Sequence, residues 1–264
     1  MGKSPRPLTD SFFAQPQREV LLSVGKTFLP CYFRKVHYTV ALFKTRKEAL
    51  EKILTGTGLI PALKWGGHYM VALGLIRYTD SDLGAYDEVI LSVPSIPVNG
   101  KSPFSHWADL VGPLAKRRVG QYIFHIPVTS TFSEAAGREL WGYPKIVAQI
   151  KHDFNIGRID SSVTDSSGKL IMRCSGRLGF SLPSIPLSLI TYSFRNGKKL
   201  RTEVNVRGRM KCYLQQSVRL EVGDSDHPMA KDIRLLGLDG KKPLMLMDSD
   251  KFQSVFGEGL TVDG

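Results

Sequence analysis

Short segments of β-strand character recur along most of the chain, and this repetition limits the fold more than any other feature of the sequence. The segments are rich in Val, Ile, Tyr, Phe and Thr, and clusters of Gly, Pro, Asn and Asp separate them. They cover residues 38–43, 69–77, 88–93, 121–128, 145–152, 170–174 and 204–214. The pair Asn196-Gly197 suits a type I′ hairpin turn, in which both central residues need a positive φ. We therefore expect an α+β fold that is dominated by strands and carries a few short helices.

Two of these helices are predicted from capping patterns. Residues 45–48 form a capping box before an apolar stripe that should end at Gly56. Residues 131–134 form a second box, and Gly142 with the proline two residues later should stop the helix that follows. A helix that ends there leaves Lys145 at the entrance of a strand. In a strand, Val147 and Gln149 would share the face of Lys145, whereas Ile146 and Ala148 would point the other way.

Size and charge fit a globular chain that could bind an acidic partner. The chain has 264 residues, and we expect a single domain over residues 1–264 with an extended arm over residues 1–25. Lys and Arg exceed Asp and Glu by 36 to 24, which gives a formal net charge of +12. The densest basic stretch, residues 195–211, carries few interleaved aromatic residues, so we interpret it as a solvated face and expect no nucleic-acid partner.

The sequence gives no indication of a membrane, disulfide or metal role. Its longest apolar stretch, residues 69–76, is too short to cross a bilayer, and the N-terminus lacks the apolar core of a secretory signal. We therefore expect a cytoplasmic protein with no membrane partner. Cys31, Cys174 and Cys212 form no C-x-x-C pair, so we expect reduced, buried thiols. The histidines lack metal-ligand spacing, and we expect neither a metal nor a cofactor.

Residues 137–145, G-R-E-L-W-G-Y-P-K, are the one stretch whose composition suggests a mechanism. A single lysine follows a rigid Gly-x-Pro exit from the predicted helix and lies among aromatic and apolar neighbours. A lysine in water has a pKa of about 10.4 and is almost fully protonated at neutral pH, whereas burial favours the neutral, nucleophilic amine. The alternative is an amphipathic lysine whose stem covers apolar surface while its ammonium group reaches water.

This stretch resembles the G-R-E-L-x-x-Y-P-K signature of the acetoacetate decarboxylase-like superfamily, in which the motif lysine forms a Schiff base with a keto substrate. Residues 83–88, L-G-A-Y-D-E, are similar to the family segment L-G-x-Y-x-E, whose glutamate lies in the active site. The resemblance covers roughly residues 28–152. It implies that Lys145 is the nucleophile and Glu88 the pocket carboxylate, within a β-barrel and antiparallel-sheet fold.

Other residues of these two motifs are candidates for the substrate pocket. The candidate substrate-binding residues are Arg138, Glu139, Trp141, Tyr143, Leu73 and Tyr86. For Trp141 and Tyr143 the alternative is packing in the core. For Arg138 and Glu139 we favour the alternative of a structural ion pair that fixes the turn before the lysine.

The sequence departs from the family pattern at three positions. Ile146 stands where the decarboxylases carry a second lysine, so burial must replace an adjacent cation in activating Lys145. Leu73 falls where the decarboxylases have a second pocket glutamate, and Val36 where they have an arginine. A small shift of register would let Arg34 or Lys35 supply that cation.

The leading hypothesis is a lyase that uses Lys145 to form an iminium with a small keto acid and decarboxylates a 3-oxo acid. The first alternative is aldolase-dehydratase or hydratase chemistry through the same iminium and enamine. The second is a member of the fold that only binds a small molecule, and a third is a nucleic-acid binder driven by the positive charge. We also expect a homo-oligomer, since oligomers are common in the superfamily that the chain resembles.

Overall fold

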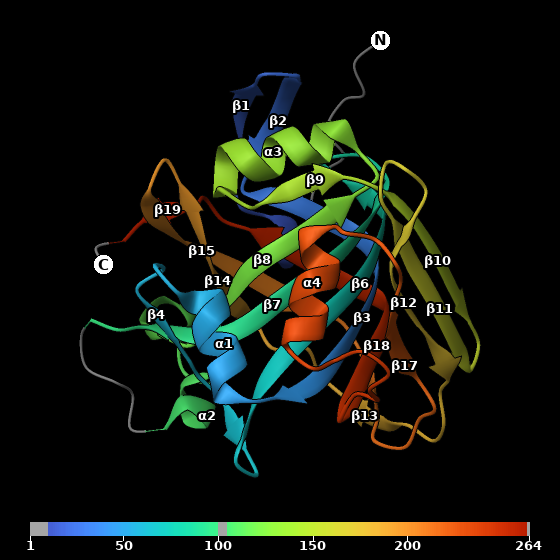
Figure 1. Cartoon of the computed structure of the whole chain (residues 1–264). Helices are drawn as coiled ribbons and strands as arrows, with labels where there is room; N and C mark the ends of the chain where they lie inside the picture. Colours follow the sequence, from blue (N-terminus) through green and yellow to red (C-terminus); the bar gives the residue numbers. More distant parts are fainter. Residues whose placement is uncertain (1–9, 100–104, 263–264) are drawn as a thin grey trace.

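Seven strands close into a β-barrel in the computed structural model, which describes residues 10–99 and 105–262 (Figure 1). In ring order they are β18 (Met245–Phe256), β3 (Cys31–Thr45), β6 (His68–Ser81), β7 (Tyr86–Pro97), β8 (Gly120–Val128), β14 (Leu189–Arg195) and β15 (Lys198–Arg207). Pairing of β15 with β18 closes the ring, and β8 with β14 is its one parallel pair. The expected strand-dominated fold with a barrel is therefore confirmed.

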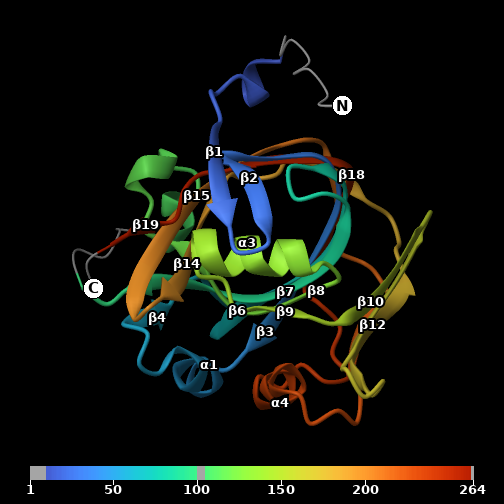
Figure 2. The ribbon, with the colours of Figure 1, turned by 90° about the horizontal axis from the view of Figure 1, so that it is seen from above.

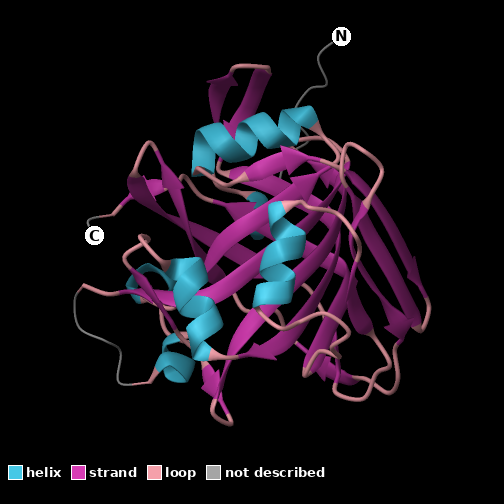
Figure 3. Cartoon of the chain, viewed as in Figure 1, coloured by secondary structure: helices cyan, strands magenta, loops and turns pink. Residues whose placement is uncertain are grey.

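A second sheet packs on the outside of the barrel (Figure 3). Its strands, in the order in which they pair, are β10 (Gln149–Asn155), β11 (Arg158–Thr164), β12 (Leu170–Arg177) and β17 (Arg219–Val222). Shorter strands extend the barrel sheet: β4 (Leu59–Pro61), β5 (Lys64–Trp65), β9 (Lys145–Val147), β13 (Leu182–Ser184), β16 (Met210–Tyr213) and β19 (Leu260–Thr261). Two of the predicted strands are thus interrupted, one at Ala148 and one between Arg207 and Met210.

Helix α3 (Thr131–Trp141) lies across one end of the barrel, and the hairpin of β1 (Arg18–Leu22) and β2 (Gly25–Leu29) lies over it (Figure 2). The remaining helical segments are α1 (Lys47–Leu54), α2 (His106–Asp109), α4 (Pro228–Leu235) and the 3-10 turns η1 (Ser11–Phe13) and η2 (Leu114–Lys116). In the described part of the chain, no helix has both the length and the apolar character needed to span a membrane.

The alternation of side chains along the barrel strands separates two cores. On β6, Leu73 and Leu75 point outward and pack against the second sheet and α4. Ile76 and Tyr78 point into the barrel, where they meet the underside of α3. The lumen of the barrel is therefore lined by one face of each strand, and the outer core supports it from behind.

The predicted hairpin turn and the two predicted helices are present, but the caps of the helices differ from the prediction. Asn196 and Gly197 have φ values of 51° and 74° and form the β14–β15 turn, as predicted. Both helices form, but neither threonine caps its helix. Thr45 belongs to β3 and donates to the Leu236 carbonyl, and Ser130, not Thr131, accepts the Ser133 N–H.

The expected N-terminal arm is largely structured in its described part. Residues 1–9 lie outside the described residues, and β1 pairs with β2 through five residue pairs from Arg18 to Leu22. The three cysteines are free thiols; Cys31 and Cys174 are buried, whereas Cys212 is only partly so. Burial raises the pKa of the Cys174 thiol to about 12, so this thiol stays protonated.

Candidate active site

The turn between α3 and β9 places Lys145 inside the barrel. Gly142 ends α3 in the left-handed conformation, with φ of 62°, and its N–H donates to the Arg138 carbonyl. The Tyr143 N–H donates to the Gly137 carbonyl, which reverses the chain over the end of the helix. Strand β9 then pairs in parallel with β8, starting with Lys145 opposite Ile126. As a result Lys145 is only 4% exposed.

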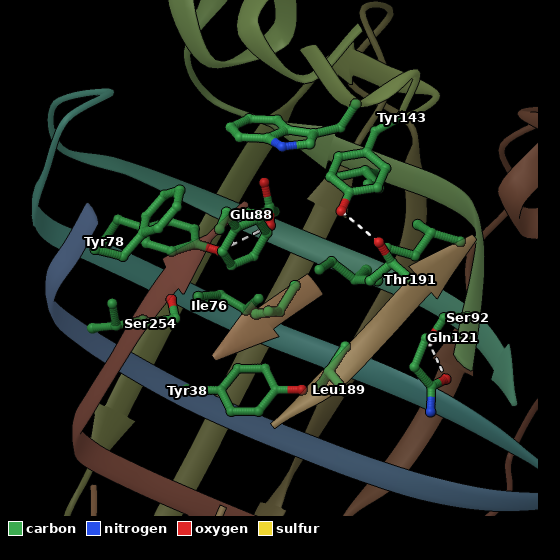
Figure 4. A pocket seen from close by; sticks show the side chains of 18 of the residues that line it. Tyr38, Ile76, Tyr78, Glu88, Ser92, Gln121, Tyr143, Leu189, Thr191 and Ser254 are labelled. Atoms are coloured by element: carbon green, nitrogen blue, oxygen red, sulfur yellow. Dashed lines mark hydrogen bonds between the residues drawn. The ribbon is translucent and has the colours of Figure 1, made fainter. Parts of the chain in front are cut away.

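The Lys145 amine lies within hydrogen-bond distance of two buried side chains. Its Nζ donates to Glu88 Oε2 at 2.6 Å and to Ser133 Oγ at 2.9 Å. The Tyr78 hydroxyl donates to the other carboxylate oxygen, Glu88 Oε1, at 3.1 Å, and Figure 4 shows these two side chains directed toward one another. This geometry gives the amine a carboxylate with which it can exchange a proton directly.

Ser133 and the glycine of the motif face the lysine because they lie on the same stripe of α3. The buried residues of the helix are Ser133, Ala136, Gly137, Leu140 and Trp141. A Cβ atom on Gly137 would lie 2.4 Å from Lys145 Cδ and 2.7 Å from Cε, so only glycine leaves room for the lysine stem. The capping pattern identifies Ser133 only as part of a helix cap. Its i, i+4 spacing to Gly137 is the signal that would have placed it in the site.

Two buried tyrosines, Tyr78 and Tyr86, lie beside the ion pair, and the half-buried Tyr38 lies farther along the cavity; all three stay protonated. Burial, together with the nearby Glu88 carboxylate, raises the pKa of Tyr38 to about 12 and the pKa values of Tyr78 and Tyr86 well above their usual range. The Tyr78 and Tyr86 rings stack at 4.4 Å, and Lys145 Nζ lies 5.2 Å from the centre of the Tyr86 ring. These hydroxyl groups are available as hydrogen-bond donors at neutral pH.

A cavity of about 90 Å³ lies beside Lys145 and Glu88. Its walls are mainly aliphatic and aromatic, and the Tyr143 hydroxyl is fixed there by a 2.7 Å hydrogen bond to Thr191 (Figure 4). Among the described residues that line it, Lys145 is the one cation and Glu88 the one anion. An apolar cavity with a few convergent polar groups is the usual form of a small-molecule site.

His152 supports the site from the outer layer, and no pattern in the sequence indicates this role. Its Nδ1 lies 2.8 Å from Ser161 Oγ, and its Nε2 lies 3.3 Å from the backbone carbonyl oxygen of Glu88. Burial lowers the pKa of His152 to about 4, so the ring is neutral at physiological pH. This contact joins β10 of the second sheet to the strand that carries Glu88.

The candidate substrate-binding residues separate into two groups. Trp141, Tyr143 and Tyr86 line the cavity. Leu73 does not, because it points to the outer face of β6 and is packed in the outer core. Arg138 and Glu139 are also outside the cavity lining, on the solvent side of α3.

The expected ion pair between Arg138 and Glu139 is a wrong prediction. Arg138 instead lies 3.6 Å from Glu134 and donates to the Lys145 carbonyl, and Glu139 accepts from the Ser23 N–H at 3.0 Å. The two side chains diverge because successive residues of a helix point in different directions. Glu139 therefore ties the β1–β2 hairpin to α3.

The departures from the family motif leave the cavity apolar. Val36 lines it, at the position where the family pattern has an arginine. Neither cation considered as a substitute is part of the lining: Arg34 is paired with Asp82 at 2.7 Å, and Lys35 is exposed. Ile146 is half-buried and does not line the cavity. Val147, which was expected to share the Lys145 face, is 47% exposed because β9 ends after three residues.

The protein is thus a closed β-barrel that holds a buried amine, Lys145, and a buried carboxylate, Glu88, at one end of its lumen. The family model of acetoacetate decarboxylase (ADC) matches residues 22–213. The chain therefore belongs to the acetoacetate decarboxylase family. No curated protein gives a significant match to the sequence.

Solved structures of this family have the same fold. The acetoacetate decarboxylase of Legionella pneumophila is 17% identical and matches with a TM-score of 0.62 over 100% of this chain and 98% of its own. An acetoacetate decarboxylase-like enzyme from Sphingomonas wittichii is 14% identical, with a TM-score of 0.61 over 89% and 93% of the chains. The enduracididine biosynthesis enzyme MppR, solved with the condensation product of pyruvate and imidazole 4-carboxaldehyde, is 15% identical, with a TM-score of 0.55 over 89% and 87%.

Proposed function

We propose that the protein is a lyase that forms a Schiff base between Lys145 and the carbonyl group of a small keto acid. The observation that carries the proposal is the placement of Lys145 Nζ, 2.6 Å from Glu88 Oε2, in a mainly apolar cavity. Such an amine is held close to a proton acceptor and away from water, which are the two conditions that imine formation needs.

The first step is a proton transfer followed by attack on the carbonyl carbon. Glu88 takes a proton from the Lys145 ammonium, and the neutral amine adds to the carbonyl while Glu88 returns that proton to the carbonyl oxygen. The resulting carbinolamine loses its hydroxyl group as water, with a proton again supplied through Glu88, and the iminium remains. Ser133, which accepts from Nζ at 2.9 Å, orients the amine during the attack.

The iminium then accepts the electron pair of the bond to be broken. With a 3-oxo acid, the bond between the α-carbon and the carboxylate breaks, carbon dioxide leaves and the electrons form an enamine. Glu88 then takes up one proton from water and delivers it to the enamine carbon, and a water molecule hydrolyses the product iminium to release the ketone and return Lys145 as its ammonium. The Tyr78 hydroxyl, bonded to Glu88 Oε1 at 3.1 Å, keeps the carboxylate oriented through these transfers.

A second candidate is condensation through the same enamine, with an aldehyde as the electrophile and loss of water afterwards. It needs the same iminium at Lys145 as the first candidate, and among the described residues that line the cavity Lys145 and Glu88 supply the amine and the proton-transfer group for it. MppR, whose structure holds a condensation product of pyruvate and an aldehyde, has the same fold.

The test is a comparison of wild type with Lys145→Arg and Lys145→Met. Each protein is incubated with carboxyl-labelled 3-oxo acids, and labelled carbon dioxide is collected. In parallel, pyruvate with an aldehyde is assayed for a condensation product. We expect one of the two products from wild type and neither from the variants, because a guanidinium or thioether cannot form an imine. Equal product from Lys145→Arg and wild type would refute the proposal.

A further inference from the structure

A second cavity lies in the barrel directly beyond the first, and its volume is about 390 Å³. The two cavities share a wall. The residues that line both are Tyr38, Ile90, Ser92, Gln121, Leu189 and Phe252. Figure 4 shows Tyr38, Leu189 and the Ser92–Gln121 pair at the end of the first cavity that is remote from Tyr143. The second cavity thus continues the site along the lumen.

The strand pattern shows how far this continuation extends. Four residues of β7 lie on the face that points into the barrel: Glu88, Ile90, Ser92 and Pro94. Glu88 lines only the Lys145 cavity and Pro94 only the second cavity, whereas Ile90 and Ser92 line both. At about 3.3 Å per residue, Glu88 and Pro94 are separated by about 20 Å along the strand. The two cavities are therefore stacked end to end and not side by side.

The second cavity lacks the charged groups of the first. None of the described residues that line it carries a charge. Its apolar side chains include Val40, Leu42, Met70, Ala72, Met245 and Met247. Methionine side chains adapt to flexible aliphatic ligands because they are unbranched and polarizable. This lining suits a hydrocarbon chain and offers no partner for a second charged group.

The far side of the second cavity reaches the surface at an apolar rim. Three residues that line the cavity are large, apolar and exposed: Trp107 at 45%, Ile185 at 72% and Leu187 at 46%. Exposed apolar side chains grouped at the mouth of a cavity are typical of an entrance for an apolar ligand. The barrel thus has an apolar path from its surface toward Lys145.

The Ser92–Gln121 pair lies where the two cavities meet. Ser92 Oγ donates to Gln121 Oε1 at 3.1 Å. Because the Ser92 hydroxyl is already bonded to Gln121, an alkyl chain can pass beside it without leaving that hydroxyl unpaired. Leu189 and Phe252 supply apolar surface at the same level of the lumen.

We propose that the substrate is larger than the small keto acid of the proposed function and is a carbonyl compound that also carries a long unbranched alkyl tail. The reactive carbonyl group lies near one end of the molecule, beside Lys145, and the tail occupies the second cavity. This inference rests on the proposed function for the position of the carbonyl group, but the tail-binding cavity can be tested without any chemistry at Lys145.

The experiment measures the binding of methyl ketones from butanone to 2-undecanone by calorimetry, without a reductant. Each added methylene group should tighten binding about fourfold, equivalent to about 0.8 kcal/mol, until the tail fills the cavity. In parallel, each ketone is incubated with borohydride, and irreversible reduction onto the protein is measured. Chain-length-dependent binding without reduction would support the tail site and refute the Schiff-base proposal. Reduction with all ketones at equal affinity would support the Schiff base and overturn this inference.

Variants in the second cavity locate the tail. Ala72→Leu fills part of the cavity, and the ratio of affinity for 2-undecanone to that for butanone should fall at least about tenfold, the equivalent of about two methylene groups. Met247→Trp is a second, independent obstruction with the same expected result. Ala115→Leu, at an exposed alanine outside both cavities, is the matched control and should retain the wild-type ratio. An unchanged ratio in both cavity variants would overturn the inference.

Discussion

Replacement of Gly137 by alanine should displace the Lys145 amine without removing any functional group of the site. The new Cβ would lie 2.4 Å from Lys145 Cδ and 2.7 Å from Cε. Carbon atoms in contact rest at about 3.5–4.0 Å, so the lysine stem must move by about 1 Å. That movement breaks the geometry in which Nζ lies 2.6 Å from Glu88 Oε2 and 2.9 Å from Ser133 Oγ.

The expected cost falls on reactivity more than on folding. A misplacement of about 1 Å in an active site can cost about 100-fold in rate. Overpacking costs about 1–3 kcal/mol, whereas alanine stabilises a helix over glycine by about 1 kcal/mol. We therefore expect a loss of about 0–2 kcal/mol in the free energy of unfolding and a fall of about 100-fold in the rate of reductive trapping of butanone.

The assay follows the pseudo-first-order rate of incorporation of butanone in the presence of cyanoborohydride. Gly112→Ala is the matched control, because a Cβ there meets only the Asp109 carbonyl oxygen, at 3.4 Å. The control should trap butanone at the wild-type rate. A Gly137→Ala variant that is folded and traps butanone within about twofold of wild type would refute the reasoning, since its stem would have moved without consequence.

Two further predictions concern stability. Removal of one member of the buried pair, by Lys145→Met or Glu88→Gln, should lower the free energy of unfolding by about 3–5 kcal/mol, as measured by chemical unfolding. The double variant should lose clearly less than the sum of the two single losses. Additive losses would contradict a direct pair. His152 has a folded-state pKa of about 4 against about 6.5 when unfolded, so the unfolded chain binds the extra proton. The free energy of unfolding should therefore fall by about 3 kcal/mol from this group as the pH drops from about 6.5 to 4. His152→Gln should remove that part of the pH dependence, and the control His68→Gln, at an exposed histidine, should keep it. If the two variants showed the same dependence of unfolding free energy on pH, the assignment of this effect to His152 would be contradicted.

The fold could be predicted from the sequence as far as local signals extend. Strand-type segments, the Asn196-Gly197 turn and the stop at Gly142 were all readable, because each depends on residues that are close in the chain. Closure of the barrel could not be derived in this way. It depends on pairing between β15 and β18, about 50 residues apart in the sequence, and no local pattern encodes that contact.

The site was predictable where a motif carried it. Lys145 and Glu88 come from two separate segments, and the structure brings them within 2.6 Å of one another. Leu73 was misplaced because a shift of one residue along a strand reverses the face to which a side chain points. His152 was missed because its role depends on the second sheet packing behind β7, a tertiary contact that its own segment does not indicate.

The most direct test of the account is a peptide map of the protein after reduction with borohydride in the presence of butanone. The account predicts one alkyl adduct, on the peptide that carries Lys145, which is buried in the cavity wall and bonded to Glu88. Adducts spread over the exposed lysines, with the Lys145 peptide unmodified, would contradict it.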